Sequence, residues 1–492
     1  MTLAADRPTT AETFESLDPA TGNVVATFPV HTSADVTAAV GRAREASVWW
    51  QGLGWSGRQE RLDAWKRLMV RRGDELAELV HRENGKPFSD ARLTEVTLPV
   101  DHIAWAGKHA PKVLGPRKVS SGLMMANQAA LLEYQPLGVV GVIGPWNYPV
   151  FTPMGSIAYA LAAGNAVVFK PSEYTPAVGK WLVDSFAEVV PEQPVLQLVT
   201  GFGETGAALC RSGVDKIAFT GSARTGKKVM AACAETLTPV LMECGGKDAM
   251  IVADDADIDA AATAALWGGM SNAGQTCVGI ERVYVTEKVY DAFVTTLTEK
   301  ARKVVAGTSY GPITMPGQVD VIRRHIADAL DRGGRALTGG HIDGGLVEPT
   351  VLVDVPEDSI AVTEETFGPT LTVAKVRDTD EAIERSNATT YGLAGSVFSK
   401  NNGVAIAKRL RTGMTSVNQV VAFAGIPSLP FGGSGDSGFG RIHGEDGLKE
   451  FARAKAITRQ KFDLPMPLLS FDRTPRIDKL LGRAVQLLHG RG

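Results

Sequence analysis

Residues 138–170 read GVVGVIGPWNYPVFTPMGSIAYALAAGNAVVFK, and this segment is the most informative about the fold. The apolar run at 138–143 predicts a short buried strand, residues 150–161 predict a helix, and residues 166–170 predict a second strand. Two strands joined through one helix are typical of a βαβ unit with parallel strands. The stretch therefore predicts an α/β fold.

The same region resembles a membrane span in hydropathy, because residues 134–169 carry no charged side chain. Glycine, proline and asparagine interrupt it at Gly141, Gly144, Pro145, Asn147, Pro149, Pro153 and Gly155. A single bilayer helix would not tolerate so many interruptions. A buried α/β unit is the better interpretation.

Predicted strands and helices continue to alternate on the C-terminal side. A helix is expected at 175–190, and strands at 195–200, 216–220 and 240–243 are separated by further helices. This alternation is typical of a doubly wound parallel sheet. The pattern then restarts, with a strand at 249–252, a helix at 256–270, a strand at 281–285 and a helix at 289–306. A second α/β domain is therefore expected.

The N-terminal side is predicted to be helical, with apolar residues at helical spacing in 34–50, 58–84 and 90–109.

The composition excludes several classes of function. A net charge of −3 gives no whole-chain attraction to nucleic acid. Four cysteines without CxxC spacing suggest neither a disulfide framework nor a zinc site, so no metal is expected. The N-terminus shows no export signal, and a reducing, cytoplasmic setting is expected.

Two glycine motifs suggest nucleotide binding but are incomplete. Residues 201–206, GFGETG, match GxGxxG, yet the next strand ends in Phe219-Thr220-Gly221 rather than in the carboxylate of the dinucleotide fingerprint. Residues 221–228 miss a phosphate-binding P-loop because Lys228 replaces the magnesium-binding hydroxyl. What remains is a strand leading through glycines into a helix, whose N-terminus can accept a phosphate.

Two residues are candidates for covalent chemistry. Cys277 lies in the small-residue turn NAGQTCVG at 272–279, although most buried cysteines simply act as small hydrophobes. Glu243 ends a predicted strand, where a buried carboxylate could have a raised pKa and act as a base. A surface or salt-bridged acid is the ordinary alternative for Glu243. Neither residue is decisive alone.

Their neighbours make the sequence resemble the aldehyde dehydrogenase superfamily. The resemblance covers nearly the whole chain, in seven blocks that follow one order: GPWNYP at 144–149, KPSE at 170–173, FTGS at 219–222, ECGGK at 243–247, GQTC at 274–277, EETFGP at 364–369, and PFGG at 430–433 with SGFGR at 437–441. This resemblance implies an NAD(P)-dependent enzyme that oxidises an aldehyde to a carboxylic acid.

The resemblance also implies residue roles. Cys277 would be the nucleophile that forms a thioester. Asn147 and the backbone N–H of Cys277 would hold the oxyanion. Glu243 would activate the water that hydrolyses the thioester.

For the cofactor, the resemblance implies NAD, with NADP possible. Lys170 and Glu173 would lie at the adenosine ribose, where a carboxylate favours NAD by repelling a 2′-phosphate. Gly221 and Ser222 would lie beneath the pyrophosphate. Glu365 would hold the nicotinamide ribose. The remaining expected cofactor contacts are Ile143, Pro145, Trp146, Ser172, Gly203 and Phe367.

The substrate is less constrained. Expected pocket residues are Phe151, Met154, Thr276, Val278 and Phe423, and residues 419–429 contain no charge. An apolar or aromatic aldehyde is favoured over a semialdehyde such as succinate semialdehyde, which needs a cation. A CoA-acylating member is the other alternative, and Glu243 argues against it. A catalytically silent member or a Cys277 and histidine thiol hydrolase is less consistent with the motifs.

Three positions depart from the family pattern. Cys244 stands where Leu is usual and is expected to pack rather than react. Ser156 and Ile442 stand where many members have a Lys and a Glu that help relay the proton from the base. His443 is a speculative substitute in that relay.

The resemblance also implies a domain plan and a homodimer or homotetramer. The cofactor domain is expected at 1–117 and 137–245, the catalytic domain at 246–445, and an oligomerisation arm at 118–136 and 446–465. Residues 466–492 form a C-terminal extension with an amphipathic helix at 476–489. That helix is expected to dock on its own or a partner subunit, and membrane association is the disfavoured alternative.

Overall fold

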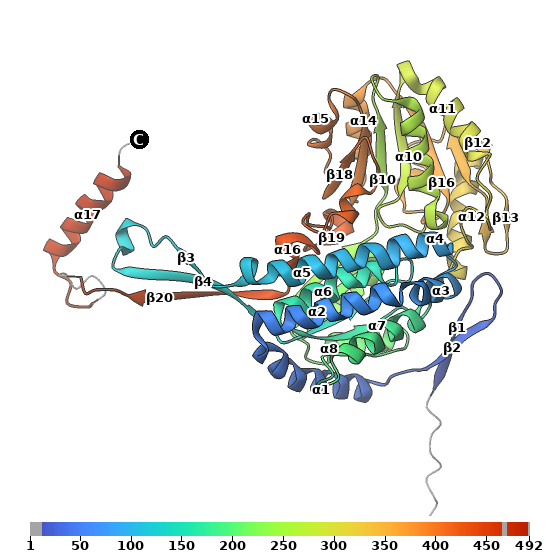
Figure 1. Cartoon of the computed structure of the whole chain (residues 1–492). Coiled ribbons are helices and arrows are strands. Elements are labelled where there is room, and N and C mark those ends of the chain that lie inside the picture. The colour runs from blue at the N-terminus through green and yellow to red at the C-terminus, as the bar shows by residue number, and fades with distance from the viewer. Residues whose placement is uncertain (1–11, 465–469, 491–492) are drawn as a thin grey trace, which may run out of the picture. The chain divides into compact units, whose positions relative to one another are not determined.

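The computed structural model describes residues 12–464 and 470–490. The chain divides into two compact units (Figure 1). The first comprises residues 1–113 and 136–452, and the second comprises residues 114–135 and 453–492. The sequence-based plan separates the arm from the C-terminal extension, whereas in the structure they fall in one unit.

The first sheet contains the βαβ unit that the sequence predicts. Its strand order is β19-β9-β8-β5-β6-β7, and only β19 is antiparallel to its neighbour. The strands are β5 (Val139–Ile143), β6 (Ala166–Lys170), β7 (Leu196–Leu198), β8 (Lys216–Gly221), β9 (Val240–Cys244) and β19 (Gly438–Phe439). The order reverses between β5 and β8, so a crevice for a ligand is expected outside the carboxyl ends of these two strands.

Helices surround this sheet (Figure 1). They are α1 (Ser33–Gly52), α2 (Gly54–Arg71), α3 (Gly73–Asn84), α4 (Phe88–Ala91), η1 (Arg92–Thr97), α5 (Leu98–Leu114), α6 (Phe151–Ala163), α7 (Pro176–Val189), α8 (Gly203–Arg211), α9 (Ala223–Ala234) and α16 (Gly444–Glu450). All thirteen residues of α6 are buried, which explains its uncharged sequence. No helix in residues 12–464 and 470–490 is long and apolar enough to cross a bilayer.

Two N-terminal predictions need correction. The helix expected at 58–84 is two helices that meet at Arg72, whose φ of −104° and ψ of 22° lie outside the helical range. Gly73 then lies close to η1, where a Cβ would lie 2.8 Å from Val96 Cγ1. The helix expected at 90–109 is interrupted by η1, a π-helical turn. A hairpin of β1 (Thr13–Leu17) and β2 (Val24–Pro29), which the sequence analysis did not predict, precedes α1.

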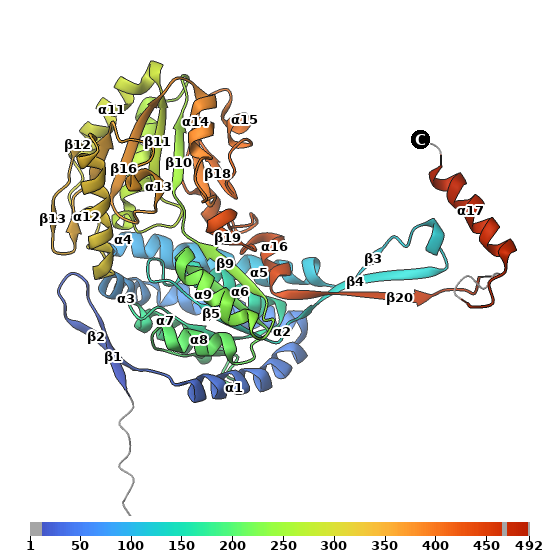
Figure 2. The same cartoon turned by 180° about the vertical axis from the view of Figure 1, so that it is seen from behind.

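The second sheet is also parallel, except for its edge strand β12. Its order is β12-β15-β16-β11-β10-β17-β18 (Figure 2). The strands are β10 (Asp248–Val252), β11 (Ile280–Thr286), β12 (Arg335–Thr338), β15 (Thr350–Val353), β16 (Thr370–Val376), β17 (Ala394–Phe398) and β18 (Met414–Val417), and a small hairpin pairs β13 (Ile342–Asp343) with β14 (Leu346–Val347). The predicted α/β fold with parallel sheets is confirmed.

Helices cover both faces of the second sheet. Val252 packs with Phe293 and Ile322 on one face, and Ile251 packs with Ile383 on the other, as alternation along a strand requires. The helices are α10 (Ile258–Met270), α11 (Glu287–Ala301), α12 (Pro316–Asp331), α13 (Ile360–Thr363), α14 (Thr379–Ser386) and α15 (Gly403–Ala407), and the short 3₁₀ turns are η3 (Ser271–Gly274), η4 (Ala422–Gly425) and η5 (Gly435–Ser437).

The second unit consists of a three-stranded sheet and a C-terminal helix. The sheet order is β20-β4-β3, from β3 (Arg117–Val119), β4 (Gln128–Pro136) and β20 (Ala452–Gln460), with the turn η2 (Leu123–Met125) between β3 and β4. The helix α17 (Pro475–His489) corresponds to the predicted amphipathic segment. None of the residues of α17 is buried, and Ile477, Leu481 and Ala484 are half-buried.

Candidate active site

Cys277 lies in a strained turn between η3 and β11. Asn272, Ala273 and Gly274 have φ angles of 52°, 56° and 71°. A Cβ at Gly274 would lie 2.0 Å from the carbonyl oxygen of Gly368, so the backbones approach too closely for a side chain. Left-handed residues other than glycine are costly and cluster at functional sites.

Side-chain hydrogen bonds hold this turn. Asn272 Nδ2 donates to the carbonyl oxygens of Asn147 and Gln275, at 3.1 Å each. Gln275 Nε2 donates to the Asn272 carbonyl at 2.9 Å, and Gln275 Oε1 accepts from the Thr314 N–H at 2.8 Å. The turn that carries Cys277 is therefore fixed before any ligand arrives.

The Cys277 thiol is partly exposed, yet its pKa is raised well above the ordinary value. Desolvation is the largest cause, and the negative charges of Glu243, Asp248 and Glu365 add to it. The thiol is therefore protonated at neutral pH in this state, and nucleophilic attack would need a base.

The neighbouring thiol of Cys244, next to Glu243 in the chain, is buried and its pKa is raised to about 12. It packs beneath α9.

Glu243 is the last residue but one of β9, and its side chain is buried. Neither carboxylate oxygen has a hydrogen-bond partner in the described part of the chain. Burial raises the pKa of Glu243 to about 8, while the nearby Thr220 hydroxyl and the Arg441 charge act in the opposite direction. A carboxyl of this kind can exchange protons near neutral pH, as a general base requires.

Asn147 lies in the loop between β5 and α6. Its side-chain Nδ2 donates to the carbonyl oxygen of Gln275 at 2.9 Å, two residues before Cys277. An amide nitrogen carries two N–H groups, so a second one remains for an incoming oxygen. The side chain is buried, which strengthens any such hydrogen bond.

A buried ion pair that sequence analysis missed supports the Asn147 loop. Lys86 Nζ pairs with Glu95 and donates to the Asn147 carbonyl at 3.1 Å. Glu95 Oε2 accepts from the N–H groups of Val150 and Phe151, at 3.0 and 2.8 Å. Glu95 lies in the π-helical turn η1, and no local motif signals its backbone contacts because Val150 and Phe151 are 55 and 56 residues away.

One cavity of about 440 Å³ reaches both Cys277 and Glu243. The other lining residues are predominantly apolar, and they are Leu93, Thr94, Leu98, Tyr148, Phe151, Thr152, Trp267, Thr276, Val278, Gln419, Val420, Val421, Ala422, Ala424, Gly425, Phe431 and Ile442. No Lys, Arg or His of the described residues lines it. Such a cavity suits an apolar ligand with one reactive polar group.

The sequence-predicted pocket residues divide into two groups. Phe151, Thr276 and Val278 line the cavity. Met154 does not, because it is completely buried inside α6, and Phe423 does not, because its ring packs against Phe431 at a centroid distance of 6.1 Å. Sequence analysis missed other lining residues, among them Leu93, Leu98 and Trp267, since they come from distant helices.

The expected cofactor residues gather at the carboxyl edge of the first sheet. Ile143 and Lys170 end β5 and β6, and Gly221 ends β8. Lys170 is buried, and its Nζ donates to the Pro171 carbonyl at 3.1 Å and lies 4.0 Å from Glu173. Burial lowers the pKa of Lys170, and the Glu173 charge opposes that shift.

Two helix N-termini lie at the same edge. Gly203 begins α8, and Ser222 caps α9 by accepting from the Thr225 N–H at 3.3 Å. Ser172 Oγ donates to Glu173 at 3.4 Å. Lys227, which would bind a phosphate in a true P-loop, instead pairs with Asp436 at 3.3 Å. The edge therefore offers helix dipoles and the partly exposed carboxylate of Glu173 rather than a P-loop.

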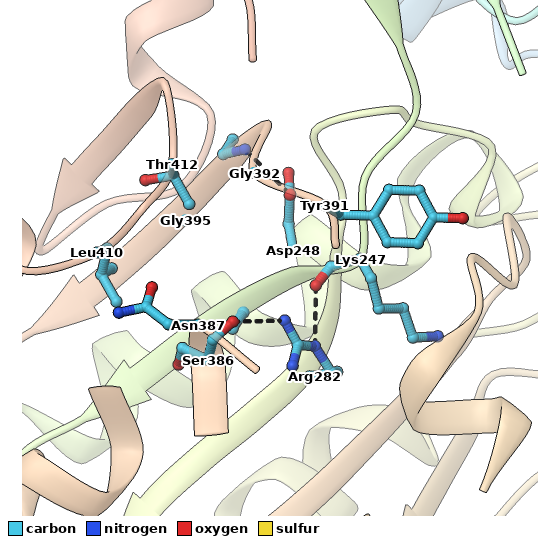
Figure 3. Close-up of a pocket in the computed structure, with 12 residues that line it drawn as sticks. Lys247, Asp248, Arg282, Ser386, Asn387, Tyr391, Gly392, Gly395, Leu410 and Thr412 are labelled. Carbon is cyan, nitrogen blue, oxygen red and sulfur yellow. Dashed lines mark hydrogen bonds between the residues drawn. The ribbon is translucent and has the colours of Figure 1, made fainter. Parts of the chain in front are cut away.

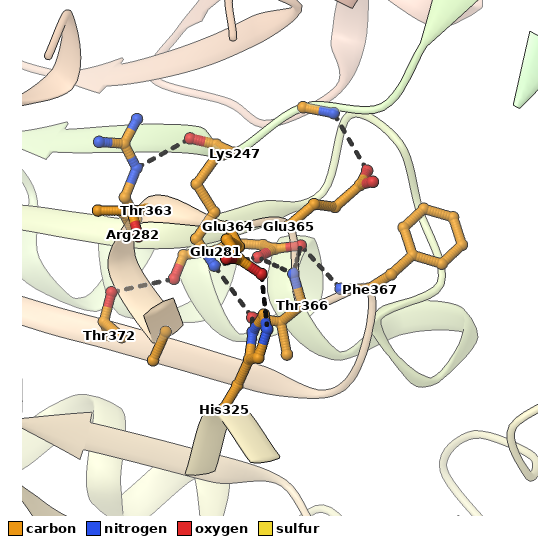
Figure 4. A network of polar contacts seen from close by, with 12 residues as sticks. Lys247, Glu281, Arg282, His325, Thr363, Glu364, Glu365, Thr366, Phe367 and Thr372 are labelled. Carbon is orange, nitrogen blue, oxygen red and sulfur yellow. Dashed lines mark hydrogen bonds and ion pairs between the residues drawn. The ribbon is translucent and has the colours of Figure 1, made fainter. Parts of the chain in front are cut away.

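A second segment, from Glu364 to Phe367, brings Glu365 toward the start of β10 (Figure 4). Glu365 Oε1 accepts from the Gly246 N–H at 3.1 Å. A Cβ at Gly245 would lie 1.9 Å from that oxygen, which explains the glycine there. Burial raises the pKa of Glu365 to about 8. The Phe367 ring meets the Trp146 ring edge-on at 5.5 Å, and Pro145 precedes Trp146 in the loop after β5.

A polar network holds this segment in place (Figure 4). Glu281 pairs with Lys247 and accepts from the N–H groups of Thr366 and Phe367, at 2.8 and 3.0 Å. Lys247 and His325 both contact Thr366 Oγ1 at 3.0 Å. Burial lowers the pKa of His325 to about 4, so this histidine is neutral.

A small second cavity lies beside the network, between Lys247, Asp248 and Arg282 (Figure 3). Its volume is about 10 Å³, enough for about one water molecule and too small for a substrate. Arg282 Nε donates to the Lys247 carbonyl at 2.9 Å, and burial raises the pKa of Asp248. This cavity is a structural feature of the core.

Two of the positions that depart from the family pattern, Ser156 and Ile442, lie near each other, since a Cβ at Gly155 would lie 2.8 Å from Ile442 Cδ1. Ile442 lines the cavity and Ser156 is buried in α6. His443 does not line the cavity. Its ring lies 3.8 Å from the His102 ring and contacts Phe151, and neither ring nitrogen has a partner in the described residues. Burial lowers the pKa of His443 well below its ordinary value.

The comparisons with known proteins agree with this arrangement. The sequence model described as "Aldehyde dehydrogenase family" matches residues 7–457. The chain belongs to the aldehyde dehydrogenase family. It is 37% identical to 4,4'-diapolycopene aldehyde oxidase of Methylomonas sp, over 89% of this chain and 84% of that protein. It is 36% identical to a putative succinate-semialdehyde dehydrogenase [NADP(+)] 2 of Mycobacterium ulcerans, over 95% and 93%.

Solved structures of this family share the fold. An NAD-dependent aldehyde dehydrogenase from Sinorhizobium meliloti has a TM-score of 0.88 and 33% identity, covering 93% of each chain. This aldehyde dehydrogenase is therefore an oxidoreductase that acts on aldehydes, in a family that uses NAD or NADP.

Proposed function

We propose that this enzyme oxidises an apolar or aromatic aldehyde to its carboxylic acid, with NAD, through a thioester on Cys277. The observation that carries this proposal is the cavity that both Cys277 and Glu243 line, together with its apolar walls. The nucleophile and the base of the proposed reaction thus meet the substrate in one space.

The first step is attack by the Cys277 sulfur on the aldehyde carbon. Because the thiol is protonated, a base must first remove its proton, and deprotonated Glu243 is the carboxylate on the same cavity. The carbonyl oxygen becomes an oxyanion as the S–C bond forms. The second N–H of Asn147 and the backbone N–H of Cys277 would donate to that oxyanion.

The cofactor fits the carboxyl edge of the first sheet. Glu173 and Lys170 would hold the adenosine ribose, Ser222 and the N-terminus of α9 the pyrophosphate, and Glu365 the second ribose. The further contacts at this edge would come from Ile143, Pro145, Trp146, Ser172, Gly203, Gly221 and Phe367. A dinucleotide held by these residues would supply the hydride acceptor for the substrate carbon, so that the substrate would become a thioester of Cys277.

The last step is hydrolysis of the thioester. Once Glu243 has released the Cys277 proton to solvent, it takes a proton from water as the water oxygen attacks the carbonyl carbon, and the C–S bond breaks to release the acid and the Cys277 thiolate. A CoA-acylating reaction needs no such base, so a buried carboxyl beside Cys277 favours water over CoA as the acceptor.

NAD is favoured over NADP because Glu173 would repel a 2′-phosphate at the ribose. Its side chain is partly exposed, with 35% accessible, so the charge can reach a ligand. The relatives include an NAD-dependent enzyme and one whose name specifies NADP(+), so the family alone leaves both cofactors open.

The cavity favours an apolar substrate over a dicarboxylic semialdehyde. A second carboxylate would need a cation, and the lining residues in the described part of the chain supply none. The relative named 4,4'-diapolycopene aldehyde oxidase is consistent with a hydrocarbon-rich aldehyde. Succinate semialdehyde, suggested by the other relative, is the second candidate.

The proposal is tested with purified enzyme and a panel of hexanal, benzaldehyde and succinate semialdehyde. Each aldehyde is supplied with NAD or NADP, with and without CoA, and NADH or NADPH formation is followed by absorbance. We expect the highest kcat/KM for hexanal or benzaldehyde with NAD and no need for CoA. Faster turnover of succinate semialdehyde, or a requirement for CoA, would contradict the proposal.

We further propose a homodimer or homotetramer in the cytoplasm. The three-stranded sheet of the second unit has edge strands β3 and β20 that can pair with another chain. The four cysteines are free, as is usual in a reducing compartment. The mass in solution by light scattering tests the oligomer.

A further inference from the structure

The loop that carries Glu365 has a strained backbone. It runs from Glu364 to Phe367, and Phe367 has a φ of 51°, in the left-handed region that a bulky residue rarely adopts. The next residue, Gly368, lies against α12, since a Cβ there would lie 2.4 Å from Ile322 Cδ1. A strained conformation of this kind persists only where the surrounding structure fixes it, and such conformations cluster at functional sites.

Glu281 holds this loop by its backbone (Figure 4). The Thr366 N–H donates to Glu281 Oε2 at 2.8 Å, and the Phe367 N–H donates to Oε1 at 3.0 Å. One carboxylate thus accepts from two successive backbone N–H groups, and hydrogen bonds to a charged acceptor are the strong ones. Glu281 is buried in β11, and the buried Lys247 supplies the opposite charge.

Thr366 is held at each of its polar groups. Its N–H donates to Glu281, and its carbonyl oxygen accepts from Gln318 Nε2 at 2.7 Å. Its hydroxyl contacts Lys247 Nζ and His325 Nδ1, at 3.0 Å each. All of these side chains are buried. The central residue of the loop therefore has a fixed position before any ligand is present.

The residues on either side of Thr366 are the two that the proposed cofactor site requires. Glu365 Oε1 accepts from the Gly246 N–H at 3.1 Å, just before β10. The Phe367 ring meets the Trp146 ring edge-on at 5.5 Å, in the segment that follows β5. A shift of the Thr366 backbone would displace both neighbours, because they are bonded to it.

A role in the stability of the core alone explains these contacts less well. A buried ion pair is often no better for stability than apolar side chains of similar volume. Here both members of the pair bind the loop, since Glu281 accepts from its N–H groups and Lys247 donates to the Thr366 hydroxyl. Position of the loop is thus what this pair provides.

We propose that Glu281 is a positioning residue for the nicotinamide half of the dinucleotide. This inference rests on the proposed placement of the second ribose at Glu365. Glu281 acts through the N–H groups of Thr366 and Phe367, which it holds so that the Glu365 carboxylate and the Phe367 ring are in place when the ligand binds. A site that is ordered in advance loses less conformational entropy on binding.

Binding of NAD and of ADP, each measured by calorimetric titration without aldehyde, tests the proposal. ADP contains the adenosine and the two phosphates but lacks the second ribose and the nicotinamide, so it reports on the edge of the first sheet alone. In Glu281→Gln one acceptor oxygen becomes an NH₂ group. We expect the Kd for NAD to rise roughly tenfold and the Kd for ADP to change less than about twofold.

Glu450→Gln is the matched control for the loss of a carboxylate. It removes the acid of another Lys–Glu pair, between Lys216 of β8 and Glu450 of α16, with side chains 7% and 24% exposed. We expect its Kd values for NAD and ADP to equal those of the parent enzyme. A similar loss of NAD binding in both variants would show that any such pair has this effect.

A second variant keeps the ion pair, because Glu281→Gln leaves Lys247 buried without its counter-ion and destabilises the fold. Thr366→Val removes only the hydroxyl that contacts Lys247 and His325. We expect its Kd for NAD to rise roughly threefold, with ADP binding unchanged. Thr372→Val is its control, since that buried hydroxyl donates to the Glu281 carbonyl oxygen at 3.3 Å and does not touch the loop.

The outcomes separate this proposal from that of the substrate and the cofactor preference. An unchanged Kd for NAD in Glu281→Gln and Thr366→Val, or equal losses of NAD and ADP binding, would assign Glu281 to the fold alone. A parent enzyme that binds NADP more tightly is tested with NADP and adenosine 2′,5′-bisphosphate in the same way. The aldehyde panel decides the substrate, and its result does not alter these binding ratios.

Discussion

Asn147 Nδ2 donates a hydrogen bond of 2.9 Å to the carbonyl oxygen of Gln275. This contact joins the loop after β5 in the first sheet to the turn that carries Cys277 before the second sheet. The proposed oxyanion donor and the proposed nucleophile are thus held by one hydrogen bond between two lobes of the same unit. Preorganisation of this kind is what stabilises charge that develops in a transition state.

Replacement of the proposed nucleophile should abolish turnover. Cys277→Ser should lose activity by several orders of magnitude, because a serine hydroxyl is far less acidic than a thiol at neutral pH. NAD binding, measured by fluorescence titration, should stay normal. Cys244→Ser is the control, since that thiol is buried beneath α9, and it should keep most activity if it folds. Equal loss in both variants would contradict the assignment.

Turnover should depend on a group that titrates near pH 8. Glu243 must be deprotonated to act as a base, and burial raises its pKa to about 8, so kcat should rise with pH until about that value. Glu243→Gln should be slow at every pH and should lose this dependence.

A control is needed because the pKa of Glu365 is also raised to about 8. Glu365→Gln should weaken NAD binding yet keep the rise of kcat with pH. If the pH dependence disappears in Glu365→Gln and persists in Glu243→Gln, the base has been assigned to the wrong carboxyl.

Cofactor preference should depend on Glu173. Glu173→Gln removes the charge that would repel a 2′-phosphate, and the ratio of kcat/KM for NAD to that for NADP should fall on the order of tenfold. Glu204→Gln, at an exposed acid in the first turn of α8, is the control. A parent enzyme that already prefers NADP would show that Glu173 does not discriminate.

The glycine at 245 should be essential for cofactor binding. In Gly245→Ala the new Cβ would meet Glu365 Oε1 at 1.9 Å, so the carboxylate must move and lose its bond to the Gly246 N–H. We expect the Kd for NAD to rise roughly tenfold or more. Gly317→Ala is the matched control, because nothing lies within 4 Å of its Cβ. An unchanged Kd in Gly245→Ala would remove Glu365 from the cofactor site.

The buried Lys86 and Glu95 pair should be important for stability. Lys86→Met leaves a buried carboxylate without its cation, at a cost of about 3 to 5 kcal/mol in the free energy of unfolding. It also frees the Asn147 carbonyl, so kcat should fall as well. Lys66→Met removes a partly exposed pair with Asp63 and should cost less than about 1 kcal/mol.

Chemical denaturation measures the free energy of unfolding of both variants. The double variant that combines Lys86→Met with Glu95→Gln should recover part of the stability that Lys86→Met loses. If Lys86→Met is as stable as Lys66→Met, the buried pair contributes little to the free energy of unfolding.

The α/β class and most strands of the two sheets could be predicted from the sequence alone. The strand predicted at 166–170 is β6 residue for residue, because a β-branched run between Gly164-Asn165 and Pro171 leaves little choice of boundary. The order of motifs also pointed to Cys277, Glu243 and Asn147 without any coordinates, since these residues lie in short stretches of characteristic sequence.

Which side chains surround Cys277 and Glu243 depends on the three-dimensional fold. Leu93, Trp267 and Ile442 line one cavity although they are far apart in the chain, whereas Met154 is buried and does not line it. The approach of Gly73 to η1 and the ion pair of Lys86 with Glu95 likewise depend on contacts with distant segments. Local periodicity reports which face of an element is apolar, but the neighbour that covers this face is set by packing across the whole fold.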